Sequence, residues 1–255
     1  MESKKEHFKR TLLDLANNEN LVPGIYNYCD RWCERCTMTK KCLTYLHEQE
    51  MKEGTGHKSP DEENKNFWEQ IRVAWEVTME MIEEDAERLN IDLDDVEDME
   101  LPEHIETPLE AKAKEYGTKM YNWLDENQPF IKEQAEKLVM INDEASMIKY
   151  KDAMEVIQWY SSFIGAKVHR AHLDLEERKN DPNDEFNIYS DNLGSAKIAI
   201  IAIERSMDAL SVFYNDFKEK EDDILKFLVE LSTIKKQLLQ TFPGVMEFKR
   251  PGFDD

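Results

Sequence analysis

Apolar residues recur at three- and four-residue spacing through most of this 255-residue chain, and this feature constrains the fold more than any other. Alternation with a period of two, which is typical of strands, is almost absent. Few glycines and prolines interrupt the stripes, with eight of each in the chain. We therefore predict an all-α fold, a bundle of about five longer helices with an N-terminal four-cysteine metal module.

The apolar stripes, together with residues that commonly start or end helices, predict where most of the helices lie. Thr107, Pro108 and Glu110 form a capping box that starts one helix. Residues 125–129 end it, a shorter helix covers 131–138, and a long helix runs from about 143 to 177. A helix at 196–217 is apolar on nearly all sides in its first half and is expected at the centre, and a last helix covers 224–238.

The helix expected after residue 66 has two contrasting faces. We expect its apolar face to pack on the core and its glutamate face to meet solvent. The apolar face carries Trp68, Ile71, Trp75, Met79, Ile82, Ala86 and Leu89. The opposite face carries Glu69, Glu76, Glu80, Glu83 and Glu87.

The charge balance excludes several classes of protein. Lys and Arg number 33 against 55 Asp and Glu, a formal net charge of −22. Because nucleic-acid binding depends on Lys and Arg that neutralise phosphates, no nucleic-acid partner is expected. The longest purely apolar run, residues 198–203, is far shorter than a membrane span, and the N-terminus has no apolar signal segment. We expect a cytoplasmic protein without a membrane partner.

Composition suggests two parts. Residues 1–53 form the metal module and residues 62–255 the helical bundle, which contains an acidic connector at 91–106. We expect the two parts to pack together as one unit.

All four cysteines lie close together, in the sequence CDRWCERCTMTKKC. On a helix, Cys29, Cys33 and Cys36 share one face, and Cys42 can close the site after a turn. Four convergent thiols favour a soft metal, and the Arg and Lys residues between them favour thiolates. Four cysteines in one short segment are typical of a [4Fe-4S] cluster, whereas structural zinc usually has two separate Cys pairs. We predict [4Fe-4S], with zinc as the alternative.

Two segments resemble known families. Tyr28 to Cys36 (YCDRWCERC) and Arg250 to Asp254 (RPGFD) resemble an uncharacterised bacterial all-α family, a resemblance that implies no activity. The spacing of Cys33, Cys36 and Cys42 resembles the iron–sulfur loop of endonuclease III type DNA glycosylases and of RecB-like nucleases, and implies ligand roles for these three cysteines. No helix-hairpin-helix pattern accompanies that loop.

The first three cysteines also fit the CxxxCxxC motif of radical SAM enzymes. Radical SAM enzymes usually have an aromatic residue just before the third cysteine, whereas this chain has Arg35 there. A fourth cysteine would also block the iron position that SAM needs. We therefore set this resemblance aside.

A second metal site inside the bundle is a weaker hypothesis. Helical bundles hold metals with inward Glu and His side chains, although the usual Glu-x-x-His pairs do not occur here. A structural role is the simpler interpretation, with His172 in the core and Glu204 paired with Lys167 or an arginine. The candidates are Glu155, His169, His172 and Glu204.

No phosphate loop, nucleophile elbow or Ser/His/Asp pattern names a reaction. Three functions stay open. The first is a [4Fe-4S] protein with a structural or redox-sensing role. The second is a helical protein whose N-terminal segment is stabilised by zinc and which binds a basic protein partner through its acidic surface. The third is a helical-bundle oxidase that uses the carboxylate and His site.

Overall fold

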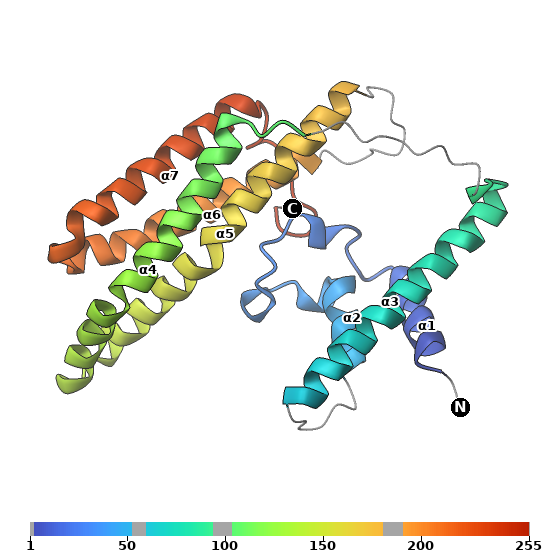
Figure 1. The fold of residues 1–255 in the computed structure, drawn as a ribbon, viewed down its shortest axis with the longest axis horizontal. Helices are drawn as coiled ribbons and strands as arrows, with labels where there is room; N and C mark the ends of the chain where they lie inside the picture. Colours follow the sequence, from blue (N-terminus) through green and yellow to red (C-terminus); the bar gives the residue numbers. More distant parts are fainter. Residues whose placement is uncertain (1–2, 53–59, 94–103, 181–190, 255) are drawn as a thin grey trace. The chain divides into compact units, whose positions relative to one another are not determined.

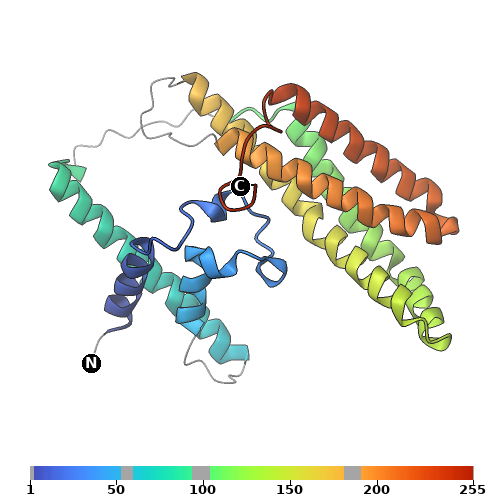
Figure 2. The ribbon, with the colours of Figure 1, turned by 180° about the vertical axis from the view of Figure 1, so that it is seen from behind.

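The computed structural model describes residues 3–52, 60–93, 104–180 and 191–254. These residues form seven α-helices, several 3₁₀ turns and no strand, which confirms the all-α prediction (Figures 1 and 2). They divide into two compact units. The first unit comprises Met1–Tyr26, Arg31–Glu103 and Pro251–Phe253, and the second comprises Asn27–Asp30, His104–Arg250 and Asp254–Asp255.

This division differs from the predicted one. The boundary follows residue 103 rather than residue 53, because the helix that begins at Pro60 contacts the N-terminal helix and belongs to the first unit. Most of the expected acidic connector, residues 94–103, lies outside the described residues.

Four helices form the bundle of the second unit. They are α4 (Pro108–Met140), α5 (Glu144–Asn180), α6 (Asp191–Asp216) and α7 (Glu221–Thr241). Each contacts the next along the chain, and α7 also contacts α4, as the green to red ribbons in Figure 1 show.

The core of the bundle is richest along α6. Ile198, Ile200 and Ile203 of this helix are all buried, as expected for a helix that is apolar on nearly all sides. Even so, neither α6 nor another helix in the described ranges is long and apolar enough to cross a membrane.

The predicted capping box starts α4. Thr107 Oγ1 accepts a hydrogen bond from the Glu110 N–H, and the Glu110 carboxylate accepts one from the Thr107 N–H. The predicted break at residues 125–129 is wrong, because α4 continues through Pro129 to Met140. Proline removes one i to i−4 hydrogen bond from a helix. Every residue of α4 that is buried lies at or before Asn127, so Pro129 stands where little packing is disturbed.

The short segment Asn27–Asp30 belongs to the bundle unit. Tyr28 is only 1% exposed, and its ring packs edge-on against Phe248 with centroids 5.2 Å apart. The ring also lies over Gly194, where a Cβ would fall 2.2 Å from two of its atoms. The close approach of Tyr28 to α6 therefore requires glycine at position 194.

Asp30 fastens the same segment to α5 and α6. Its carboxylate accepts a hydrogen bond from the Tyr160 hydroxyl and one from Arg205 Nη1, both at 2.6 Å. Burial, followed by the hydrogen bond to Asp30, raises the pKa of Tyr160 to about 12. Tyr160 is therefore a neutral donor throughout the physiological pH range.

The first unit contains α1 (Lys4–Ala16), α2 (Leu43–Lys52) and α3 (Pro60–Leu89). The N-terminal helix α1 contacts both of the others. Lys9 of α1 donates hydrogen bonds to Glu80 at 2.7 Å and to Glu84 at 2.6 Å, which lie along one side of α3. Ion pairs between two helices are thus part of the contact within this unit.

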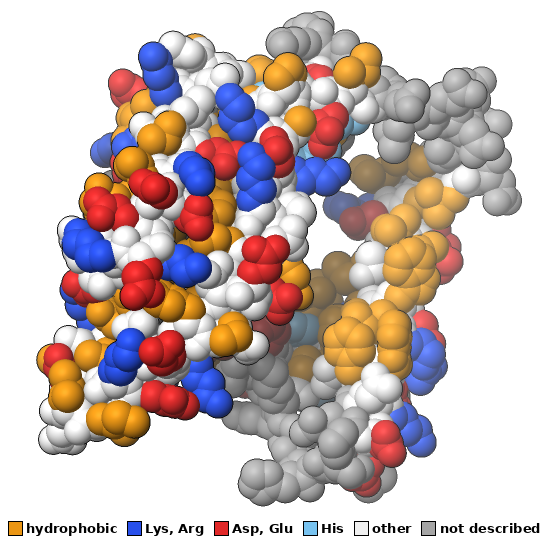
Figure 3. All heavy atoms as spheres, turned by 60° about the vertical axis from the view of Figure 1, so that its left-hand side comes forward, with side chains coloured by type: hydrophobic (Ala, Val, Ile, Leu, Met, Phe, Trp, Pro, Cys, Tyr) orange, Lys and Arg blue, Asp and Glu red, His pale blue; other side chains and the backbone are white. Residues whose placement is uncertain are grey.

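The expected orientation of α3 is wrong. Trp68 and Trp75 are 62% and 69% exposed, whereas Val73 and Val77 are buried. The lysines of α1 explain the difference, since they pair with glutamates of α3 and draw that side of the helix toward α1. We call the outward side the exposed α3 face, part of which appears in orange at the right of Figure 3. It consists of Trp68, Ile71, Trp75, Met79, Ile82 and Leu89.

The Glu80 ion pairs predict a dependence of stability on pH. Glu80 pairs with both Lys5 and Lys9, and their hydrogen bonds lower the pKa of Glu80 to about 2 from an ordinary 4.5. Because the pKa is lower in the folded state, this contribution is present above pH 4.5 and is lost as the pH falls toward 2. We expect Glu80→Gln to lower the melting temperature at pH 7 and to leave it unchanged near pH 2, measured by circular dichroism.

Glu83→Gln, at an exposed position on the same helix, is the matched control and should have no effect at either pH. An equal effect of Glu80→Gln at both pH values would contradict the assignment of this stabilisation to the ion pairs.

Candidate functional site

The cysteine segment is built from turns. Cys33–Arg35 is a 3₁₀ turn, and the backbone at Cys36 is extended. Arg31 has a φ of 59°, in the left-handed region, which an α-helix does not accommodate. The prediction that Cys29, Cys33 and Cys36 share one face of a helix is therefore wrong.

Backbone hydrogen bonds shape the segment around its sulfur atoms. The Met38 N–H donates to Cys36 Sγ at 3.3 Å. The Cys36 N–H donates to the Cys33 carbonyl at 3.2 Å, and the Cys42 N–H donates to the Thr39 carbonyl at 3.3 Å. All four cysteines are half-buried. The Met38 N–H thus provides a backbone donor at the sulfur of one of the predicted ligands.

The structure does not gather the cysteines of the first unit into a metal site. Within the described ranges, the groups of three or more His, Cys, Asp or Glu ligand atoms that lie within 4.8 Å of one another contain no cysteine. Cys33, Cys36 and Cys42 belong to the first unit, and Cys29 belongs to the second.

The four residues of the weaker second-site hypothesis do not come together either. Glu204 accepts a hydrogen bond from Lys235 at 2.7 Å, and Glu155 pairs with a lysine one turn away on α5. His172 is 5% exposed, and its Nδ1 donates to the Val168 carbonyl at 2.9 Å. Of the candidates Glu155, His169, His172 and Glu204, only His169 lies in a group of possible metal ligands.

That group lies in the second unit, where the chain enters α4. Glu110 Oε1 is 2.7 Å from His104 Nε2 and 2.7 Å from His169 Nδ1. His104 Nδ1 is in turn 2.8 Å from Glu176 Oε2. We call His104, Glu110 and His169 the His–Glu–His cluster. It brings two imidazole nitrogens and one carboxylate oxygen within 4.8 Å of one another.

Hydrogen bonds hold the Glu110 carboxylate in its charged form. Glu110 is 2% exposed. Burial alone raises the pKa of a carboxyl group, but the hydrogen bonds from Thr107, His169 and His104 outweigh it and bring the pKa of Glu110 to about 2. The hydrogen bond to Glu176 is the main cause that raises the pKa of His104.

Sequence reasoning missed two members of this cluster. His104 lies in the stretch interpreted as an acidic connector, and Glu110 had a sufficient role as the second half of the capping box. The cap uses Oε2 of Glu110 and leaves Oε1 for the two histidines. A histidine six residues before a capping glutamate was the available signal, but it carries information only once the position of α5 is known.

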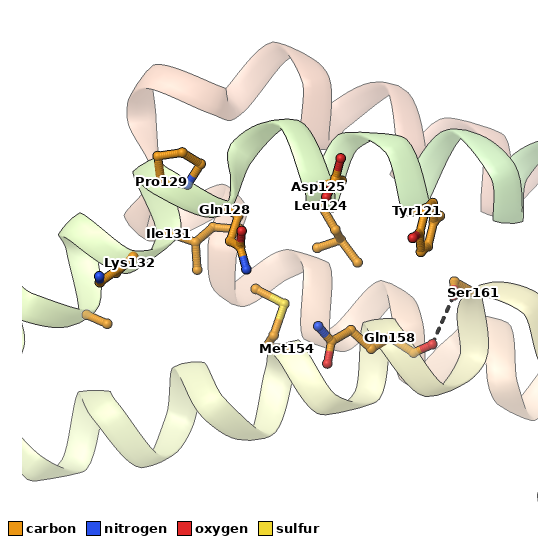
Figure 4. A pocket seen from close by; sticks show the side chains of 11 residues that line it. Tyr121, Leu124, Asp125, Gln128, Pro129, Ile131, Lys132, Met154, Gln158 and Ser161 are labelled. Carbon is orange, nitrogen blue, oxygen red and sulfur yellow. Dashed lines mark hydrogen bonds between the residues drawn. The ribbon is translucent and has the colours of Figure 1, made fainter.

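Two grooves run between α4 and α5. The first has a volume of about 690 Å³ and reaches Glu110 and His169, with Gly117 and Gly165 among its lining residues. The second, of about 1000 Å³, is drawn in Figure 4, where Leu124 and Met154 face each other across it. Both grooves share Tyr121, Gln158 and Ser161 along their walls. Glu110 and His169 of the His–Glu–His cluster therefore line a groove along the α4 and α5 seam.

Comparison with known proteins gives no match: no family model, no curated protein and no solved structure is significantly similar to this chain.

Proposed function

We propose that this protein is a metalloprotein that binds a [4Fe-4S] cluster through Cys29, Cys33, Cys36 and Cys42. The observation that carries the proposal is that all four cysteines of the chain lie within residues 29–42. Four thiolates are the usual ligand set of such a cluster. A staple made of disulfides is a weaker explanation, because disulfides that stabilise a fold usually join distant segments.

Local features of the segment support cluster binding. Arg31, Arg35, Lys40 and Lys41 place positive charge among the cysteines, which would offset the negative charge of the bound centre. The Met38 N–H already donates to Cys36 Sγ. Hydrogen bonds to the sulfur atoms also tune the potential of an iron–sulfur centre.

The ligand count limits what the cluster can do. When the protein supplies all four ligands, no iron keeps an open position for a substrate. A cluster held in this way can stabilise the fold or sense oxidants. Oxidants could reach it because the cysteines are only half-buried. Zinc is the alternative metal for the same four thiolates, and the experiment below separates the two.

Cys36→Ser is expected to abolish loading of the cluster. The protein is purified without oxygen, and iron, acid-labile sulfide and zinc are measured per chain together with the visible spectrum. The wild-type protein should be brown and contain iron and sulfide in equal amounts, about four of each. The variant should contain almost none, because a serine hydroxyl is a much weaker ligand of cluster iron than a thiolate.

Thr37→Ser is the matched control, since it changes the adjacent residue and should retain full loading. If Cys36→Ser holds as much iron and sulfide as the control, the ligand assignment is wrong. Colourless wild-type protein with about one zinc per chain would show that the cysteines bind a structural zinc ion instead of an iron–sulfur cluster.

A further inference from the structure

The His–Glu–His cluster draws its ligands from three places that the fold holds in position. His104 precedes α4, Glu110 lies in the first turn of α4, and His169 lies on α5. The backbone at Glu110 is fixed by the capping box, and the residue before His169, Val168, is completely buried. Glu110 and His169 therefore meet because α4 packs on α5, and His104 joins them from the segment just before α4.

We propose that His104, Glu110 and His169 bind a divalent transition-metal ion, with Glu176 orienting His104 from behind. Two imidazole nitrogens and one carboxylate oxygen are the ligand set of many zinc and non-haem iron(II) sites that keep open positions. This site is separate from the cysteine segment in residues and in ligand chemistry. It shares only His169 with the four residues that the sequence suggested.

The three ligand atoms are close to one another, and a rearrangement of the two histidine rings would complete a metal site. Metal bonds to nitrogen and oxygen are about 2.0–2.2 Å long, which places neighbouring ligand atoms about 3 Å apart. Glu110 Oε1 now lies 2.7 Å from each of the two imidazole nitrogens. The two imidazole nitrogens are up to 4.8 Å apart, so binding requires both rings to move toward the ion by roughly 1 Å. The imidazole protons that bridge these atoms would leave as the metal enters.

The surrounding hydrogen bonds have the pattern of a metal site. His104 Nδ1 lies 2.8 Å from Glu176 Oε2, so a carboxylate orients the ring and leaves Nε2 for the metal. The second oxygen of Glu110 accepts the Thr107 N–H at 2.8 Å, which fixes the carboxylate in the same way. Partners of this kind orient the ligands and strengthen metal binding by about 10–100-fold.

The site also has an open side. The His169 side chain is 50% exposed, and the groove of about 690 Å³ between α4 and α5 ends at Glu110 and His169. With three protein ligands, the ion would keep at least one position for water or for a small molecule that enters the groove. The chemistry thus favours a site with exchangeable ligands over a closed structural one.

A cobalt titration tests the proposal on the full chain after removal of metals by a chelator. Cobalt(II) bound to thiolates gives a strong charge-transfer band in the near ultraviolet and strong visible bands, whereas cobalt(II) bound only to nitrogen and oxygen ligands gives weak visible bands and no such charge-transfer band. We expect the wild-type protein to show visible bands that belong to a nitrogen and oxygen site, independent of any thiolate band. Competition with zinc then gives the affinity for zinc.

His169→Ala should weaken this binding by more than about 100-fold, and Glu176→Gln should weaken it by about 10–100-fold. His7→Ala, on a partly exposed histidine of α1, is the matched control and should bind as the wild type does. Circular dichroism checks that each variant is folded. Because Glu176 is a partly exposed side chain near the end of α5, its variant retains the fold even if the His169 variant does not.

Two results would overturn the proposal: a wild-type protein without cobalt bands of the nitrogen and oxygen type, or equal affinities for the wild type, His169→Ala and Glu176→Gln. In either case the cluster is an ion pair in which His104 bridges two carboxylates. Titration of Cys36→Ser separates this outcome from the cysteine proposal, since the variant should lose the strong bands of a cobalt–thiolate site and retain the weak visible bands of the nitrogen and oxygen site.

Discussion

Phe213→Ala is expected to lower the free energy of unfolding of the bundle by about 3–5 kcal/mol. Phe213 is 1% exposed and stacks on Phe217, with ring centroids 4.8 Å apart and planes within 8°. Tyr150 approaches Phe213 edge-on at 5.9 Å. Truncation to alanine would leave a cavity among these rings, and the α5 and α6 backbones around it can close it only in part.

Denaturant unfolding followed by circular dichroism measures this loss, with the two units treated as separate transitions where they resolve. Tyr121→Ala provides the control, because it removes an aromatic side chain that is 69% exposed on a helix of the same bundle. Its effect should stay within about 0.5 kcal/mol. Equal effects of the two substitutions would show that the rings around Phe213 do not form the core.

Gly117→Ala is expected to destabilise the bundle by about 1–3 kcal/mol, although alanine favours a helix over glycine by about 1 kcal/mol. A Cβ at position 117 of α4 would lie 2.5 Å from the Ser161 carbonyl oxygen of α5. Backbone atoms cannot rotate away as a side chain can. The two helices would have to separate along the seam that forms the grooves.

Gly165→Ala is the matched comparison on the facing helix. A Cβ there would lie 3.3 Å from Lys114 Cα, a tight distance that a shift of a few tenths of an ångström relieves. The loss should therefore be smaller than for Gly117→Ala, when both are measured by the same denaturant titration. The opposite order would mean that α4 and α5 do not meet as closely as the structure indicates.

The sequence allowed the helices to be predicted where local signals and core packing agree. The capping box at Thr107 and the apolar run around Ile200 are both in place in the structure. Pro129 misled the prediction, because a proline signal is local and the cost of a proline inside a helix depends on the packing around it. The face of α3 was misassigned for a similar reason, since ion pairs with α1 depend on a partner whose position the sequence of α3 does not contain.

The candidate sites depend even more on contacts that local sequence signals do not contain. The four cysteines could be proposed as ligands because they are neighbours in the chain, but the left-handed backbone at Arg31 was not visible in the spacing. The His–Glu–His cluster could not be found in this way. His104 and His169 are distant in sequence, and only the packing of α4 against α5 brings them to Glu110.

The exposed α3 face has a consequence for how molecules of this protein behave toward one another. Apolar patches attract, and this attraction does not weaken when salt is added. A net charge of −22 opposes it by electrostatic repulsion, which reaches only about 8 Å at physiological ionic strength. We therefore expect charge, rather than a fully polar surface, to oppose association between molecules, and we expect colloidal stability to fall as the salt concentration rises.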